Sequence, residues 1–383
     1  MAGIVKIEGK IQTYQWGGRD YLASLLSKKN DHQQAWAEYW LGTHPSAPSI
    51  LATKAKEFLP DYIHKRALPE LQFLLKVLDV KDILSIQVHP TREQALSGYE
   101  KENAAGIPAN AKQRNYKDKS DKPELAVALS EFWLLHGFKS IDAISDALST
   151  QPYLAPLHQH LKQNGLAKAF EMALDQSNPL VQQMHSALID DLAGKHFKKT
   201  QIEFWIQRWV SRNPGINTGI LTLYFLNLVK MNAGEAIYQP PGLLHAYMEG
   251  QNIELMANSD NVLRAGLTPK HIDVPELLRI CQLQPTQPED FYIKPHTLAS
   301  GERIFNTPFK QFQLSVLESN LATEFQWQSN SLEILFCYQG CCELDAGNGN
   351  SYASQGQAFL LEPGTNIVLK GEDFCVYRSI NTL

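Results

Sequence analysis

The chain has 383 residues, of which 44% are hydrophobic and 20% are charged, and its formal net charge at pH 7 is −5. The length predicts two or three domains, and the composition is typical of a soluble globular protein. The acidic balance, without a basic stripe, argues against a nucleic-acid-binding protein, and an anionic substrate would have to meet a local cluster of cations.

The sequence predicts neither a leader nor a membrane anchor. Residues 1–9 lack the apolar core of a secretory signal, and the longest apolar run, 219–231, is interrupted by polar residues and too short to span a bilayer. We therefore expect a cytoplasmic protein with no membrane partner. The five cysteines are odd in number, so thiols packed in strands are favoured over a disulfide framework or a metal site at Cys337, Cys341 and Cys375.

Residues 1–137 are predicted to form mainly strands and turns. Four ranges have the length and composition of strands: 73–80, 83–89, 125–129 and 132–135. The polar stretch 92–122 predicts a helix and a loop that lie over the strands.

The pattern becomes helical from about residue 140 to residue 213. Asn178 is suited to cap a helix with Pro179 at its first position, and apolar residues then recur at helical spacing. A second apolar stripe runs from Ile202 to Val210. A helix-turn-helix DNA reader is a weak alternative, because these helices carry too few Lys and Arg residues for phosphate contacts.

Strands return after the helical segment. The predicted ranges are 221–231, 236–239, 245–247 and 253–256. Residues 290–383 predict short strands joined by Gly-rich turns, such as 345–350, which indicates a second all-β domain.

Polar and apolar residues alternate in the strand before Pro90. Residues two apart share a face of a strand, so Ser85, Gln87 and His89 point one way and Ile86 and Val88 the other. Buried polar groups are costly unless they are satisfied. A strand that presents Gln and His side by side therefore predicts a lined cavity.

Two further segments supply candidate ligands. Lys122 and Glu124 share a strand face, and a buried Glu is expensive unless it is paired or bound to a cation. The pattern G-x5-P-x-G-x2-H, from Gly234 to His245, is the second cupin motif, in which tight turns deliver the histidine to the interior of a barrel. Tyr247 follows with the same parity.

The donor set predicts the metal. Two imidazoles, a carboxylate and an amide oxygen, from His89, His245, Glu124 and Gln87, suit one zinc ion best, with Mn, Fe or Co as substitutes. His158 and His160 lie two apart in the helical segment, where side chains diverge, so we expect a solvated face there. His44 and His136 have no supporting pattern.

Seven segments together resemble the type I phosphomannose isomerases, which are zinc cupins. They are residues 15–18, 37–45, 84–90, 116–118, 122–126, 241–247 and 254–270, the last reading ELMANSDNVLRAGLTPK. The resemblance implies zinc ligation by Gln87, His89, Glu124 and His245. One departure is that Ser120 and Asp121 stand where the family usually has Asn-His before Lys-Pro-Glu.

The resemblance implies a mainly β fold with two cupin-type (jelly-roll) β-barrel domains and an α-helical insertion domain. The implied parts are a catalytic cupin in two pieces, a helical insertion between them and a C-terminal cupin: 1–137, 138–220, 221–285 and 286–383. The C-terminal part keeps the motif's turn at Pro363 and Gly364 without a following histidine, so we expect it to hold no metal. A monomer is expected.

The implied reaction interconverts mannose 6-phosphate and fructose 6-phosphate through a cis-enediolate, with a proton moving between C2 and C1. The candidates for catalysis are Lys122 and Glu254 as proton carriers and Arg264 as a donor to the enediolate or to phosphate. The candidates for substrate binding are Ser85, Lys270, Tyr247, Trp16, Glu38 and Asp260. Whether Asp121 replaces the family's histidine stays open.

Two other functions remain open from the sequence. An iron-dependent cupin oxygenase would usually have two close histidines and a carboxylate, and Gln87 in place of one histidine argues against it. A non-catalytic sugar-binding or storage cupin would not need Lys122, Glu254, Arg264 and Lys270 near the metal.

Overall fold

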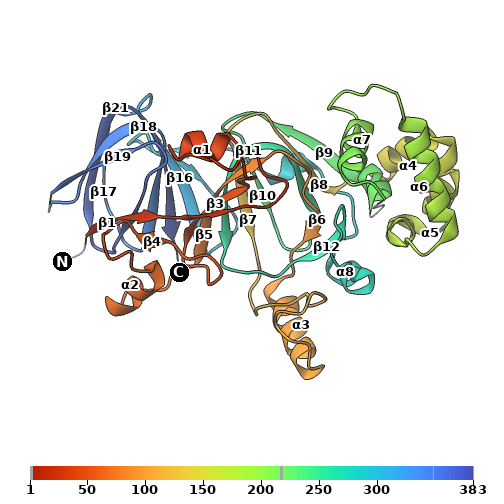
Figure 1. Cartoon of the computed structure of the whole chain (residues 1–383), viewed down its shortest axis with the longest axis horizontal. Coiled ribbons are helices and arrows are strands. Elements are labelled where there is room, and N and C mark those ends of the chain that lie inside the picture. The colour runs from red at the N-terminus through yellow and green to blue at the C-terminus, as the bar shows by residue number, and fades with distance from the viewer. Residues whose placement is uncertain (1–2, 216–218, 348, 383) are drawn as a thin grey trace.

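The computed structural model describes residues 3–215, 219–347 and 349–382. It consists mainly of two antiparallel sheet assemblies, with a group of helices beside one of them (Figure 1). The prediction of a mainly β fold with a helical segment is confirmed. None of the described helices is long and apolar enough to cross a membrane. The five predicted free cysteines are free thiols.

The first assembly consists of 11 strands and has two layers that share one strand, β11 (His245–Ala257). The last eight residues of β11 pair with β5 (Phe73–Val80), and five of them also pair with β7 (Glu124–Ala128). The first residues of β11 pair instead with β6 (Ile86–Val88) and β8 (Phe132–Phe138). One strand therefore carries side chains from both layers into the space between them.

The side chains of β5 alternate between a hydrophobic core and the space between the two layers. Phe73, Leu75 and Val77 face a hydrophobic core that also contains Phe312 and Leu314 of the C-terminal part. The opposite face carries the alternate residues, among them Lys76. The range 73–80 was predicted as a strand and is one, with all eight residues buried.

The helical segment covers the outer face of the second layer. Its helices are α4 (Ile141–Ser149), α5 (Ala155–Leu174), α6 (Pro179–Leu192) and α7 (Ile202–Arg212). Asn178 caps α6 as predicted, with its side chain accepting from the Leu180 N–H at 3.0 Å. Ile86 and Val88 belong to the same core as these helices, so the apolar face of β6 packs outward and its polar face points inward.

The prediction of a strand over 221–231 is wrong in its first half. Residues Ile220–Phe225 form a 3-10 helix, η2, and β9 begins only at Leu226 and ends at Met231. All six residues of η2 are buried, so the run shows no periodicity that would separate a helix from a strand. Thr222 donates from its hydroxyl to the Gly219 carbonyl at 2.5 Å, which supports the turn.

The second assembly is built mainly from the C-terminal residues. Only short strands were predicted there, and this is wrong for two of them. The strands β18 (Glu333–Asp345) and β21 (Asn366–Asn381) have 13 and 16 residues. Gly340 lies inside β18 with φ +69° beside a register shift. The N-terminal strand β1 (Ile4–Glu8) pairs with β20 (Ala358–Leu361) and thus joins this sheet.

Helix α3 (Arg92–Ala104) projects from the first assembly, as Figure 1 shows, and begins with a capping box between Thr91 and Gln94. The remaining helices are α1 (Tyr21–Leu25), α2 (Leu59–Lys65), α8 (Val274–Ile280), η1 (Pro152–Leu154) and η3 (Pro288–Phe291). The remaining strands are β2 (Lys10–Gln12), β3 (Glu38–Gly42), β4 (Ile50–Leu51), β10 (Ala236–Gln239), β12 (Leu263–Gly266), β13 (Tyr292–Ile293), β14 (His296–Thr297), β15 (Arg303–Phe305), β16 (Phe312–Glu318), β17 (Glu324–Gln328) and β19 (Asn350–Ser354).

Candidate metal centre

Three of the four predicted metal ligands converge between the two layers. His89 follows β6, Glu124 opens β7 and His245 opens β11. The Nε2 atoms of His89 and His245 lie 3.2 and 3.3 Å from the two carboxylate oxygens of Glu124. One ligand atom from each residue lies within 4.8 Å of the others, and all three side chains are buried. This geometry lets one cation touch all three.

The hydrogen bonds of the two imidazoles leave their inner nitrogens open. Nδ1 of His89 lies 2.8 Å from the Asn261 carbonyl oxygen, and Nδ1 of His245 lies 3.0 Å from that of Leu243. A carbonyl only accepts, so each Nδ1 carries the proton and each Nε2 has a free lone pair. Both Nε2 atoms and Oε2 of Glu124 are buried without a hydrogen-bond partner. The donor set therefore fits a divalent cation.

Gln87, the fourth predicted ligand, lies on β6 directly opposite His245. Residues directly opposite in an antiparallel pair share a face, so Gln87 shares the inward face with His245. Arg264 of β12 lies opposite Gln87 on its other side. Ser85, just before β6, is half-buried. The register thus places the predicted amide ligand and a predicted cation next to each other.

The charges around the cluster favour the protonation states that a metal needs. Burial, together with the charge of Lys122, lowers the pKa of His89 to about 4. Burial alone would raise the pKa of Glu124, but Lys122 and the two imidazoles outweigh it and hold that pKa well below its ordinary value. Lys122 Nζ lies 2.9 Å from Glu124 Oε1. Neutral imidazoles and an ionised carboxylate are the ligand forms of these groups.

A second buried charge cluster extends from the first, and its central residue was missed in the sequence. Lys76 of β5 lies 2.9 Å from Glu254 and 3.7 Å from Glu38, and its ammonium faces the Trp40 ring at 5.0 Å. Tyr247 donates to Glu254 at 2.8 Å. The available signal was a lysine in the middle of the apolar run 73–80, which has no place in a buried strand unless it is paired.

The electrostatics of this second cluster keep Lys76 charged. Burial would lower the pKa of Lys76, but Glu254 and Glu38 outweigh it and raise that pKa. Burial also raises the pKa of Glu254, against the opposing charge of Lys76. Burial and the charge of Glu254 raise the pKa of the Tyr247 phenol well above its ordinary value. Glu254 is thus engaged by a cation and a phenol.

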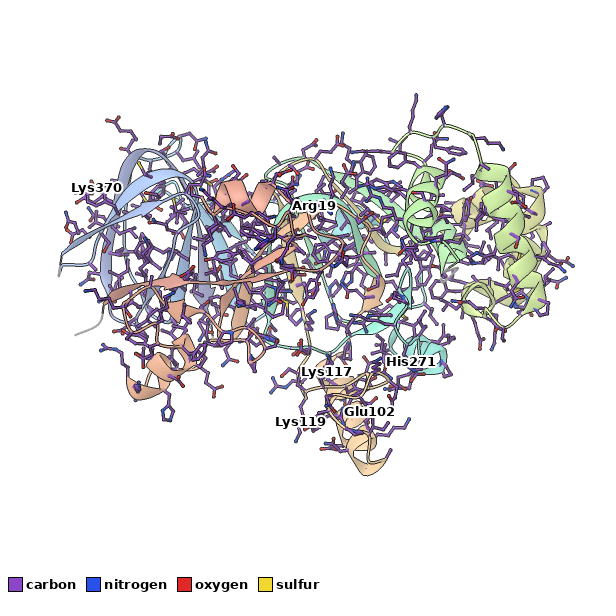
Figure 2. The ribbon with its side chains drawn as sticks, viewed as in Figure 1. Arg19, Glu102, Lys117, Lys119, His271 and Lys370 are labelled. Carbon is purple, nitrogen blue, oxygen red and sulfur yellow. The ribbon has the colours of Figure 1, made fainter. Side chains whose placement is uncertain are left out.

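Cations gather beside the metal cluster. Burial lowers the pKa of Arg264, and burial with the charges of Arg264 and Lys117 lowers the pKa of Lys270. These three cations are therefore close enough to repel one another. Lys117 and Lys119 lie near α3 (Figure 2), where Lys119 covers the Tyr99 ring at 5.5 Å. This is the local cation cluster that an anionic substrate would need in an acidic chain.

The other predicted residues lie around the same space or beside it. Asp260 is half-exposed, with its carboxylate 3.4 Å from Nε2 of His44, and this contact lowers the pKa of Asp260. Trp16 stacks on Tyr14 with ring centroids 5.8 Å apart. Asp121 accepts a hydrogen bond at 3.1 Å from Gln311 of the C-terminal part, so it has a partner outside the cluster.

Two further histidines have different surroundings: His158, which was expected on a solvated face, and His136, which has no sequence pattern. His158 is partly buried within the helical segment, 2.8 Å from the Ser145 hydroxyl. His136 of β8 is fully buried directly opposite His245, with Nε2 3.1 Å from the Tyr238 carbonyl oxygen. Burial lowers the pKa of His136 to about 3. His136 reaches the centre only because β8 pairs with β11 in this register, and no local sequence pattern indicated that pairing.

Comparisons with known proteins agree on one family. Residues 4–141 match the family model described as phosphomannose isomerase type I, catalytic domain. The chain is 32% identical to mannose-6-phosphate isomerase of Escherichia coli K12, over 96% of this chain and 97% of the relative. It is 33% identical to mannose-6-phosphate isomerase of Salmonella typhimurium LT2, over 98% and 96%.

Solved structures give the same result. A mannose 6-phosphate isomerase from Salmonella typhimurium, bound to substrate (f6p) and zinc, superimposes with a TM-score of 0.89 at 32% identity and covers 100% of both chains. A zinc-bound form of mannose 6-phosphate isomerase gives the same score, identity and coverage. The fold around the His89–Glu124–His245 cluster is therefore shared with proteins whose structures hold zinc.

Proposed function

The chain belongs to the type I phosphomannose isomerase family, and from this premise we propose that it interconverts mannose 6-phosphate and fructose 6-phosphate. The observation that carries the proposal is the convergence of three buried ligand atoms without hydrogen-bond partners, on His89, Glu124 and His245. A buried polar cluster with open lone pairs is costly unless a cation completes it.

We propose that Gln87, His89, Glu124 and His245 hold one zinc ion. Bound zinc would supply Lewis-acid polarisation of the substrate's oxygens. The backbone carbonyls of Asn261 and Leu243 orient the two imidazoles and fix their tautomers. The proposed ligand atoms are nitrogen and oxygen. Such a set suits zinc better than the metals that prefer thiolate or thioether ligands.

The proton transfer through a cis-enediolate is assigned to Lys122 and Glu254. Lys122 is only 12% exposed at its side chain and contacts Glu124, so its ammonium faces the centre. Glu254 has a raised pKa because of its burial, which suits a group that holds a proton during part of a cycle. Lys76 and Tyr247 fix the orientation of Glu254 through its two oxygens.

Substrate recognition is assigned to the surrounding polar groups. Arg264 and Lys270 form a cation cluster suited to a phosphate group, and Arg264 would otherwise stabilise the enediolate. Asp260 has a lowered pKa, because of its contact with His44, and would accept hydrogen bonds from sugar hydroxyls. The remaining proposed substrate contacts are Ser85, Tyr247, Trp16 and Glu38.

The domain organisation stays a proposal as well. We infer two cupin-type jelly rolls, the first formed by 1–137 and 221–285 and the second by 286–383, with 138–220 as a helical insertion. Strand β1 pairs with β20 of the C-terminal part and with β4, so part of residues 1–137 would belong to the sheet of the second unit. A monomeric, cytoplasmic enzyme fits the proposal.

A coupled assay tests the function directly. Fructose 6-phosphate formation from mannose 6-phosphate would be followed with the zinc-loaded protein and with His245→Ala. The wild type should turn over and the variant should not, while His160→Ala, on helix α5 outside the cluster, should keep the wild-type rate. Absence of turnover in the zinc-loaded wild type would overturn the proposal.

A further inference from the structure

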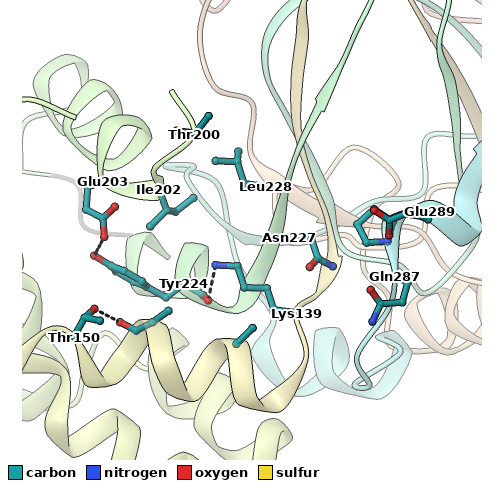
Figure 3. Close-up of a pocket in the computed structure, with 13 residues that line it drawn as sticks. Lys139, Thr150, Thr200, Ile202, Glu203, Tyr224, Asn227, Leu228, Gln287 and Glu289 are labelled. Atoms are coloured by element: carbon teal, nitrogen blue, oxygen red, sulfur yellow. Dashed lines mark hydrogen bonds between the residues drawn. The ribbon is translucent and has the colours of Figure 1, made fainter. Parts of the chain in front are cut away.

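A cavity of about 560 Å³ lies between the helical segment and the first sheet assembly, lined by none of the candidate metal-centre residues. Its walls come from α4, α7 and η2, from β9 and from the segment that leads to the C-terminal part (Figure 3). This volume is in the range of roughly 300–1,000 Å³ that is usual for small-molecule sites. The cavity is therefore large enough for a molecule of several carbons.

Two opposite charges line the cavity without pairing to each other. The Lys139 ammonium, mostly withdrawn from water, donates to the Tyr224 carbonyl oxygen at 3.3 Å. No carboxylate among residues 3–215, 219–347 and 349–382 makes an ion pair with Lys139 within 4 Å, although Glu203 is near enough to act on its pKa. Glu203 accepts from the Tyr224 hydroxyl at 3.2 Å. Burial lowers the pKa of Lys139, as expected for an ammonium short of a counter-charge.

Hydrogen-bond acceptors line the same cavity as this cation. The amide nitrogen of Asn227 is committed to the carbonyls of His136, Phe138 and Thr286, which leaves its oxygen for a ligand. Gln287 and Glu289 stand on the wall opposite Glu203 (Figure 3). Lys139 is the one cation among the described residues that line this cavity, so it can pair with a single negative charge, while Glu203, Glu289 and the Asn227 oxygen can accept from hydroxyl donors. A second negative charge on the ligand would meet only the two carboxylates and would be repelled.

We propose that this cavity is a binding site for a sugar acid, a polyhydroxylated monocarboxylate whose carboxylate meets Lys139 and whose hydroxyls meet Glu203 and Asn227. The site is separate from the proposed isomerase centre and does not depend on it. It draws on residues from the helical segment, the first assembly and the connection to the second, so its occupant contacts all three parts.

Calorimetric titration of the zinc-loaded protein with D-gluconate tests the site. Gluconate should bind, and D-glucitol, which lacks the carboxylate, should bind at least about tenfold more weakly. Lys139→Met should weaken gluconate binding about tenfold to a hundredfold, because a hydrogen bond to a charged group is lost. Lys168→Met, at an exposed lysine of α5 that pairs with Glu171, is the matched control and should leave the affinity unchanged.

A second variant protects the test against misfolding. Ala143→Leu fills the cavity from α4 with a good helix former and leaves Lys139 in place, and it should also weaken gluconate binding at least about tenfold. Both cavity variants should keep the KM for mannose 6-phosphate. Unchanged gluconate affinity in both variants, or no binding by the wild type up to about 10 mM, which lies beyond the ~1 mM scale of weak specific sites, would overturn the proposal without bearing on the isomerase.

Discussion

The His89–Glu124–His245 cluster of the first sheet assembly and the Arg378 cluster of the second assembly differ in whether their polar atoms are paired. In the first, His89, Glu124 and His245 aim acceptor atoms at a common point, and three of these atoms have no hydrogen-bond partner. In the second, Arg378 donates to Glu333 at 2.7 and 2.8 Å and to Glu302 at 3.0 Å. We call the Arg378 cluster closed, because its charged groups pair with one another. We call the His89–Glu124–His245 cluster open, because acceptor atoms in it have no hydrogen-bond partner.

Trp327 makes two further contacts with the Arg378 cluster. The Trp327 indole donates to Glu333 at 3.0 Å, and the ring lies under the Arg378 guanidinium at 4.5 Å. Burial would lower the pKa of Arg378, but Glu333 and Glu302 outweigh it and raise that pKa. The contrast teaches that buried charge alone does not mark a functional site. The mark is a set of converging buried acceptor atoms that have no hydrogen-bond partner and that a cation would satisfy.

The largest expected effect comes from breaking the open cluster. Glu124→Gln removes the negative charge that two imidazoles and Lys122 share, so zinc content and turnover should fall together. The loss of turnover should exceed the roughly 100-fold that losing an outer partner of a metal ligand costs. Elemental analysis and the coupled isomerase assay measure it. Full zinc content in this variant would show that the cluster does not need the Glu124 carboxylate to bind zinc.

Breaking the closed cluster should affect stability instead. Arg378→Met leaves the Glu302 and Glu333 carboxylates buried without the cation that pairs with them, which should lower the free energy of unfolding by about 3–5 kcal/mol. Denaturant titration measures this, and turnover per folded, zinc-loaded molecule should stay at the wild-type value. A variant that folds as stably as the wild type but loses turnover would reverse the assignment of the two clusters.

The pH dependence of stability should arise mainly in the first assembly, from buried His136. The pKa of His136 is about 3 in the folded protein and about 6.5 in an unfolded chain, so the unfolded state binds one more proton between these values. Stability of the metal-free protein should therefore fall as the pH drops from about 6.5 towards 3, by up to about 1.4 kcal/mol per pH unit.

His136→Gln should flatten that dependence, and His160→Gln should not. Melting temperatures of the metal-free proteins across this pH range provide the comparison. Parallel curves for the wild type and His136→Gln would mean that the buried imidazole does not set the acid sensitivity.

The smallest expected effect is at the edge of the closed cluster. Trp327→Phe keeps an aromatic ring near Arg378 but removes the donor to Glu333, which should cost about 1 kcal/mol of stability. Since Arg378 still pairs with both carboxylates, zinc content and turnover should not change. A destabilisation as large as that of Arg378→Met would show that the indole, and not the guanidinium, closes the cluster.

Local patterns predicted much of the first assembly. The ranges 73–80 and 236–239 are strands with the predicted bounds, because mostly apolar runs of strand length leave a strong signal. Parity along 85–89 placed Gln87 on the inward face. The helix at Pro179 followed from its cap.

Long-range pairings were beyond sequence patterns. Nothing near residues 4–8 indicates that they pair with 358–361, and Lys76 meets Glu254 only because β5 and β11 are neighbours. The 3-10 helix at Ile220–Phe225 is buried all round, so neither helical nor strand periodicity appears. The candidate ligands were predicted from their chemical types, whereas their partners depend on the register.

Removal and return of the metal test the central claim most directly. After chelation, the protein should retain its fold by circular dichroism, show no turnover of mannose 6-phosphate, and regain full turnover when one equivalent of zinc is added per chain. Full turnover by the metal-free protein would contradict the account, because the open atoms of His89, Glu124 and His245 would then serve no cation in catalysis.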